Sequence, residues 1–137
     1  MIQIREDNLA IWHSENIPYT RVDLSGFLTA QQFQERLSNP KLWGLVAEKA
    51  VANILINGSE LHRFGTEDID WITTGFLQNA AAAGIRKVSV VVAGNVYDLL
   101  ANIFDSCAAS ASNERIAIRF FYDSQFYDGW EAVSWFD

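Results

Sequence analysis

The apolar positions in the middle of the chain follow first the pattern of a buried strand and then that of a helix. Residues 53–56 form a short, mostly apolar and β-branched run, which is typical of a strand covered on both faces. Gly58 and Ser59 come next and are expected to end this strand. Residues 88–92 form a second run of the same kind. With a helix between the two runs, residues 51–92 make a strand–helix–strand unit around which the other elements are expected to be arranged.

The helix of this unit is predicted over residues 66–83. Thr66 precedes Glu67 and Asp68, so it suits the N-cap position, with two acids at the positive end of the helix dipole. Gly84 follows a run of alanines and suits the C′ position just past the helix. The residues expected on the buried face recur at spacings of three and four: Ile69, Ile72, Phe76 and Ala80.

Alternating patterns near the start of the chain predict antiparallel strands. Residues 2–13 contain two short runs separated by a few polar residues, which indicates a β-hairpin. Residues 19–24 alternate Tyr, Arg and Asp with Thr, Val and Leu, as a half-buried strand does. Ser25 and Gly26 are expected to end that strand.

Helix caps follow these strands. Thr29 and Gln32 occupy the N-cap and N3 positions of a capping box. Asn39 and Pro40 restart a helix, with Asn as the cap and Pro at the first helical position. The side chains expected to face inward from these two helices are Phe33, Leu37, Leu42, Leu45, Val46 and Ala50.

The last third of the chain predicts a helix, a strand and a closing helix. Residues 93–95 suit a turn and cap, and the next helix has the clearest amphipathic pattern in the chain. Its predicted buried face comprises Val96, Leu99, Leu100, Ile103, Phe104 and Cys107. Residues 108–113 predict a loop and residues 116–122 a strand. Asp123 and Ser124 suit the cap of a final helix, whose inner face is predicted to comprise Phe126, Trp130 and Val133.

After the opening hairpin, strands and helices alternate, which is the signature of an α/β sheet with a parallel portion. The chain has 137 residues, of which 50% are hydrophobic, enough to form one core. We therefore expect a single α/β domain over residues 1–137, with a mixed β-sheet that combines an N-terminal antiparallel hairpin and βαβ units.

Charge and composition narrow the class of protein. The net charge is −7 without any run of Lys or Arg, which argues against nucleic acids and anionic membrane surfaces as partners. The start lacks the apolar region of a signal peptide, and no stretch approaches the roughly 18 apolar residues that a membrane span needs. We expect a cytoplasmic protein without membrane insertion. The single cysteine, Cys107, excludes an internal disulfide and is expected to be a buried structural thiol.

Two stretches resemble a known family. They read ANILINGSELHRFGTEDIDW, at residues 52–71, and IRFFYDSQFYDGWEAVSWF, at residues 118–136. With the predicted order of elements, they resemble the STAS fold of the anti-anti-sigma factors, and more closely the bacterial STAS-like proteins grouped with the CRAL-TRIO lipid carriers. The second stretch is similar to that family's ending, in which a strand closing on Arg-Phe-Phe leads to an acidic turn and a helix with Glu-Ala-X-X-Trp. The resemblance covers most of the chain and implies a STAS-like fold.

The resemblance also implies a place for phosphorylation. In anti-anti-sigma factors, a Ser at the strand-to-helix junction is phosphorylated within an Asp-Ser-Ser-Gly-like motif. The corresponding residues here are 64–68, where the motif is absent and Thr66 is the only acceptor. A phosphate on Thr66 would be favoured by the helix N-terminus and disfavoured by Glu67 and Asp68. The alternative role of Thr66 is that of an N-cap.

The loop after the central strand is the expected place for a site, because ligands commonly bind beyond the carboxyl ends of parallel strands. It contains Ser59 and His62, but no Gly-X-Ser-X-Gly sequence, so no catalytic residue is assigned. His13 and His62 lack the spacing of a metal pair, and we expect neither a metal nor a cofactor. Gly94 and Asn95 lie between a strand and a helix, where an anion can bind.

These observations favour two functions. Trp71 is expected to be partly exposed and suits a contact with a partner or an apolar ligand. The first hypothesis is a non-enzymatic regulatory or protein-interaction module of STAS type, whose acidic surface favours a basic partner patch. The alternative is a carrier of a small apolar, lipid-like molecule, which needs a cavity of roughly 300 Å³ or more. An enzyme ranks third, and a homodimer is compatible with the sequence.

Overall fold

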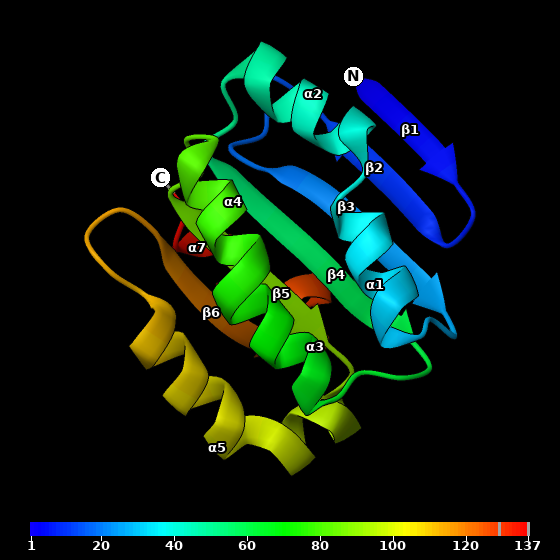
Figure 1. Ribbon diagram of the computed structural model, residues 1–137, viewed down its shortest axis with the longest axis vertical. Coiled ribbons are helices and arrows are strands. Elements are labelled where there is room, and N and C mark those ends of the chain that lie inside the picture. The colour runs from blue at the N-terminus through cyan, green and yellow to red at the C-terminus, as the bar shows by residue number, and fades with distance from the viewer. Residues whose placement is uncertain (129, 137) are drawn as a thin grey trace.

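The protein is built on a mixed β-sheet. The computed structural model describes residues 1–128 and 130–136, and within them one six-stranded sheet has its strands in chain order (Figure 1). The first three strands are antiparallel and the third to sixth are parallel. They are β1 (Ile2–Glu6), β2 (Leu9–His13), β3 (Thr20–Gly26), β4 (Asn53–Leu61), β5 (Lys87–Val92) and β6 (Ala117–Tyr122). The predicted α/β class, with an antiparallel hairpin and βαβ units, is confirmed.

The two faces of the sheet are covered unequally. Figure 1 shows the helices of the crossovers in front of the sheet and the C-terminal segment behind it. The front helices are α1 (Ala30–Leu37), α2 (Pro40–Lys49), α3 (Thr66–Trp71), the π-helix η1 (Ile72–Phe76), α4 (Leu77–Ala82) and α5 (Gly94–Ala111). The short helices behind are α6 (Ser124–Tyr127) and α7 (Glu131–Ser134). None of the helices described is long and apolar enough to cross a membrane.

Alternation along the strands divides the core between these two layers. Ile54, Ile56, Val88, Val90, Ile118 and Phe120 belong to the larger core beneath the front helices. Their neighbours Leu55, Val91 and Phe121 point the other way and pack with Phe126, Ala132 and Phe136, a group that we call the C-terminal core. Strands buried on both faces require apolar residues in both phases, which explains the continuous runs in β4 and β5.

Three of the predicted cap signals formed, those at Thr29, Asn39 and Gly84. The Thr29 side chain accepts a hydrogen bond from the Gln32 N–H at 3.2 Å, and the Gln32 side chain accepts from the Thr29 N–H at 3.0 Å. Asn39 caps α2, whose first residue is Pro40. Gly84 has a φ of +95°, the left-handed conformation in which glycine has no steric penalty. Ala50 was expected to face inward, but it is exposed at the end of α2 with a φ of 50°.

The prediction that Gly58 and Ser59 end the central strand is wrong. β4 continues to Leu61, because the register between the two strands shifts after Asp23 and Asn57, and Ser25 and Gly26 then pair with Glu60 and Leu61. The glycine fits in the strand because β5 passes close by. A Cβ atom on Gly58 would lie 3.1 Å from Leu61 Cδ1 and 3.3 Å from the Val91 carbonyl oxygen.

Gly58→Ala is therefore expected to lower the free energy of unfolding by about 1–2 kcal/mol, through overpacking against a backbone that cannot easily move. Gly44→Ala is the matched control. A Cβ atom there meets nothing within 4 Å, and the position lies inside α2. Alanine should stabilise that helix by up to about 1 kcal/mol. Urea denaturation measures both changes, and equal effects of the two substitutions would contradict this account of Gly58.

The helix predicted over residues 66–83 is interrupted by the π-helix η1. The prediction that Thr66 is the N-cap is wrong, since Gly65 is the N-cap and Thr66 is the first helical residue. The hydroxyl groups of Thr73 and Thr74 accompany the wider turn and donate to the carbonyl oxygens of Ile69 and Asp70 at 2.9 and 2.6 Å. The predicted buried face is confirmed, since Ile69, Ile72, Phe76 and Ala80 are each at most 1% exposed.

The prediction for α5 is wrong in part. Phe104 is its one fully buried residue, whereas Leu99 is 82% exposed and Ile103 is 37% exposed. The reason is that α5 lies over the last strand at the edge of the sheet, so only a narrow stripe of the helix finds a surface to cover. Cys107 is only partly buried. The helix also extends to Ala111, through residues expected to form a loop.

The end of the chain forms two short helices in place of the one predicted. Phe126 is buried, but Trp130 is 61% exposed and has a φ of 67°, which breaks the helix. Trp135 closes the C-terminal core. Its ring Nε1 donates to Ser89 Oγ at 2.6 Å, and the guanidinium group of Arg119 lies 4.7 Å from the ring centroid. The C-terminal segment is thus held to the sheet by a buried serine as well as by apolar packing.

Candidate functional site

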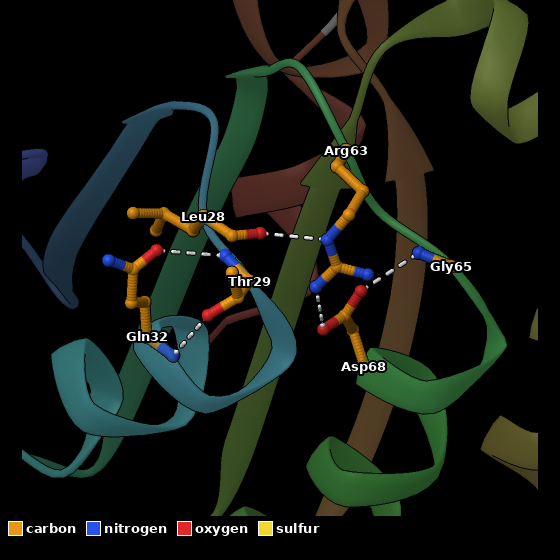
Figure 2. A network of polar contacts seen from close by, with 6 residues as sticks. All are labelled: Leu28, Thr29, Gln32, Arg63, Gly65 and Asp68. Atoms are coloured by element: carbon orange, nitrogen blue, oxygen red, sulfur yellow. Dashed lines mark hydrogen bonds and ion pairs between the residues drawn. The ribbon is translucent and has the colours of Figure 1, made fainter.

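A polar network fills the predicted site at the carboxyl ends of β3 and β4. Figure 2 shows the Arg63 side chain between two loops. Its Nε donates to the Leu28 carbonyl oxygen at 2.8 Å, and its Nη2 lies 2.9 Å from Asp68 Oδ1. The other Asp68 oxygen accepts from the Gly65 N–H at 2.9 Å. Asp68 is 1% exposed, so both of its oxygens are bonded inside the protein and the network acts as a structural link.

The structure does not join Ser59 and His62 into a reactive pair. Ser59 Oγ donates to Asn57 Oδ1 at 2.8 Å. His62 is exposed, and its backbone N–H donates to the Gly26 carbonyl oxygen at 2.9 Å. Thr66 is exposed on the first turn of α3. No hydrogen bond connects any two of these three side chains in the described part of the chain, and no group of three metal-ligating side chains occurs there.

The other predicted residues belong to two different elements, α3 and α5. Trp71 is half-buried, with its ring 6.2 Å from Phe33 and 6.0 Å from Phe76, so it belongs to the core beneath the front helices. Gly94 and Asn95 form the first turn of α5. A Cβ atom on Gly94 would lie 3.5 Å from Asp123 Oδ1. That carboxylate already places negative charge near this helix N-terminus and would repel an external anion.

A groove crosses the half of the sheet that the C-terminal segment leaves uncovered. It has a volume of about 280 Å³ and runs over β1, β2 and β3 to the edge of α6. We call it the sheet-face groove. The residues that give it its chemistry are Arg5, Trp12, Asp23, Asn57, Glu60 and Tyr127. The groove lies beside Ser59 of the predicted set, because Asn57 accepts the Ser59 hydrogen bond.

Aromatic rings and guanidinium groups alternate along this face. The Arg5 guanidinium lies 5.2 Å from the Trp12 ring, and that of Arg21 lies 4.9 Å from the Phe126 ring. Trp12 and Arg21 are paired across β2 and β3. Such cation–π pairs hold the rings in place at a partly exposed surface. Trp12 Nε1 is buried and has no hydrogen-bond partner among the described residues. This face of the sheet therefore carries a hydrogen-bond donor that the described residues do not use.

Two charged groups at this face of the sheet, Arg21 and Glu6, have shifted pKa values. Burial alone would lower the pKa of Arg21, but the hydrogen bond and the charge of Asp23, at 2.7 Å, raise it. A hydrogen bond from Asn39 and the ammonium group of Lys41 hold the pKa of Glu6 below its usual value. Three carboxylates line the groove beside Arg5, those of Glu6, Asp23 and Glu60, and the first two are paired with Lys41 and Arg21. Tyr127 is 50% exposed, and its hydroxyl accepts from the Asn57 amide at 2.8 Å.

Sequence reasoning missed the sheet-face groove, although one signal for it was present. In β2 the buried residues are Leu9 and Ile11, so Trp12 falls on the outward phase of an alternating strand. A tryptophan at such a position is a candidate contact residue. Nothing local indicated that this half of the sheet would lack a covering layer.

Two other cavities are large enough for a small molecule. One of about 350 Å³ lies between residues 13–20 and residues 49–52, beside the ion pair of Glu15 and Lys49. Another of about 300 Å³ lies between α4 and the end of α5, with Leu77 and Ile116 among its lining residues and Arg115 beside them. A comparison of the sequence with models of known protein families found no match, and a comparison with curated proteins found none either.

Proposed function

We propose that the protein is a non-enzymatic regulatory module of STAS type, which acts by binding another protein through the sheet-face groove. The observation that carries the proposal is the pair of Arg5 and Trp12 in the groove, on the part of the sheet that the C-terminal segment leaves uncovered. Tryptophan, tyrosine and arginine are the residues that most often dominate the energy of protein interfaces. The carboxylates beside them favour a partner whose contact surface is basic.

The groups in the groove support binding rather than catalysis. Asn57 is bonded to Tyr127 and Ser59, and Asp23 is bonded to Arg21. No nucleophile among the described residues is hydrogen-bonded to a histidine in the groove. The antiparallel opening, the parallel strands and the C-terminal helix after β6 agree with the STAS-like resemblance in their order along the chain.

The test immobilises the wild type, Trp12→Ala and Phe27→Ala, and exposes each of them to an extract of the source cells. Trp12→Ala removes the central ring, and Phe27→Ala removes an aromatic side chain that is 63% exposed and outside the groove. A true partner should be retained by the wild type and by Phe27→Ala. After purification it should bind Trp12→Ala about 30-fold more weakly, the loss expected for a hot-spot tryptophan. The proposal would be refuted if every protein retained by the wild type were bound equally well by Trp12→Ala.

A second candidate function, a carrier of a small apolar molecule, is favoured by the cavity between α4 and α5. Its volume of about 300 Å³ reaches the lower limit for such ligands. Native mass spectrometry of protein purified from its source should then show an added mass that disappears on denaturation. The same sample tests Thr66, since a phosphoryl group would survive denaturation and map to this exposed residue, and it also reveals any homodimer.

A further inference from the structure

Most positively charged side chains of the protein are engaged within the fold. The chain contains ten Lys and Arg residues. Those whose charged group makes an ion pair, a hydrogen bond or a cation–π contact are Arg5, Arg21, Arg36, Lys41, Lys49, Arg63, Lys87 and Arg119. Within the described residues, the guanidinium groups of the other two, Arg86 and Arg115, make no such contact, and both side chains are exposed.

These two arginines line one cavity. It has a volume of about 250 Å³ and lies at the amino ends of β5 and β6, where Lys87 pairs with Ala117. The backbone beside each arginine is fixed. The Arg86 carbonyl oxygen accepts from the Ala117 N–H at 2.9 Å, and Asn113 Oδ1 accepts from the Arg115 N–H at 2.8 Å. The fold therefore holds two guanidinium groups at one place without using either of them.

The balance of charge in this cavity suits a single negative charge. Lys87 also lines the cavity, but its ammonium group donates to the Trp135 carbonyl oxygen at 2.7 Å. Glu114 supplies one carboxylate against the two guanidinium groups. In a chain with a net charge of −7, the remaining positive charge is matched by one carboxylate of a ligand, which a guanidinium group binds through two parallel hydrogen bonds.

An apolar cavity adjoins the charged one. The cavity of about 300 Å³ between α4 and the end of α5 shares Asn113, Arg115 and Ile116 with it. Leu77 and Ile116 belong to its apolar wall, and Arg115 is the one charged residue among those that line it. A molecule whose apolar part fills this cavity would therefore have its polar end at Arg115.

We propose that the two adjoining cavities bind a small amphipathic carboxylate, with its apolar chain between α4 and α5 and its carboxylate group at Arg115 and Arg86. This inference rests on the second candidate function, that of a carrier, and names the class of its ligand. It is independent of the sheet-face groove, because no residue lines both that groove and either of these cavities.

The test uses octanoate as the probe and 1-octanol as its uncharged counterpart, and follows the backbone amide signals of the full chain by NMR during titration. Octanoate should bind about tenfold more tightly than 1-octanol, and its affinity should fall as salt is added. Arg115→Gln should weaken octanoate binding about tenfold and leave 1-octanol binding unchanged. Arg86→Gln should have a smaller effect, because Arg86 lines the charged cavity alone. Lys41→Gln removes a positive charge from α2 and should change neither affinity.

Ala111→Leu places a larger side chain in the apolar cavity and should weaken the binding of both probes. The proposal is overturned if octanoate and 1-octanol bind equally, or if Arg115→Gln binds octanoate as the wild type does. Equal binding that Ala111→Leu weakens would leave the carrier function standing without its carboxylate site. If neither probe shifts the signals of residues 77–82 and 111–117, the carrier function of this cavity fails as well. Trp12→Ala should leave octanoate binding unchanged, so the result for the sheet-face groove is separate.

Discussion

Arg63→Ala is expected to lower the free energy of unfolding by about 3 kcal/mol. The substitution would leave the Asp68 carboxylate, which is 1% exposed, with one of its oxygens unpaired in the interior. It would also release the Leu28 carbonyl oxygen from its hydrogen bond. Removing one partner of a buried ion pair costs about 3–5 kcal/mol, and the lower end applies because the Arg63 side chain is 28% exposed. Urea denaturation followed by circular dichroism measures the loss.

The double variant Arg63→Ala with Asp68→Ala distinguishes the energy of the ion pair itself from the cost of leaving one buried charge without its partner. It removes both ions, so it should be more stable than the sum of the two single losses predicts. Arg63→Lys keeps the charge but lacks the planar guanidinium group that bonds Leu28 and Asp68 together. Its free energy of unfolding should lie between those of the wild type and Arg63→Ala. A loss below about 1 kcal/mol for Arg63→Ala would show that water replaces the arginine and that the link is not structural.

Trp135→Ala is expected to cost about 3 kcal/mol of stability, the usual loss for removing a large aromatic side chain from a packed site. The ring packs with Phe121 and Phe136, and Arg119 lies over it. Its removal also leaves Ser89, which is 0% exposed, without the hydrogen bond from the indole N–H. The change is measured by thermal and urea unfolding.

Two variants make the Trp135 result specific. Trp135→Phe keeps an aromatic ring and loses the bond to Ser89 Oγ, so about 1 kcal/mol should be lost. Trp130→Ala removes a tryptophan that is 61% exposed only five residues earlier and should change stability by no more than about 0.5 kcal/mol. Equal losses for Trp130→Ala and Trp135→Ala would mean that the C-terminal segment is not anchored as described.

Features that depend on neighbouring residues could be predicted from the sequence. The Thr29 capping box, the Asn39 cap and the glycine at position 84 each rest on a few adjacent residues, and each formed. The existence and burial of the central strands β4 and β5 could be predicted, because a strand buried on both faces shows a continuous apolar run. The end of β4 was not, since it depends on pairing with β3 more than thirty residues away.

The exposed face of α5 and the Arg63 network lie beyond local patterns for the same reason. The spacing of Leu99 and Ile103 reports a helical period, but not the width of the surface beneath the helix. The sequence indicated Asp68 only as an acid at the positive end of a helix dipole. Its pairing with Arg63, whose other partner is the carbonyl group of Leu28, could not be read from neighbouring residues. The candidate groove depends on which half of the sheet remains bare, and that is decided by the path of the last residues of the chain.

The order of the strands in space has a consequence for synthesis on the ribosome. Because neighbours in the sheet are also successive in the chain, each emerging strand finds its partner already made, and no earlier strand must wait for a later one to be inserted beside it. One face of β4, β5 and β6 differs, because the residues that cover it come after all of the strands. Leu55, Val91 and Phe121 gain their cover only when Phe126 and Phe136 leave the exit tunnel. A nascent chain stalled after β6 would therefore expose this apolar strip, which makes it the stage at which chaperone binding is expected.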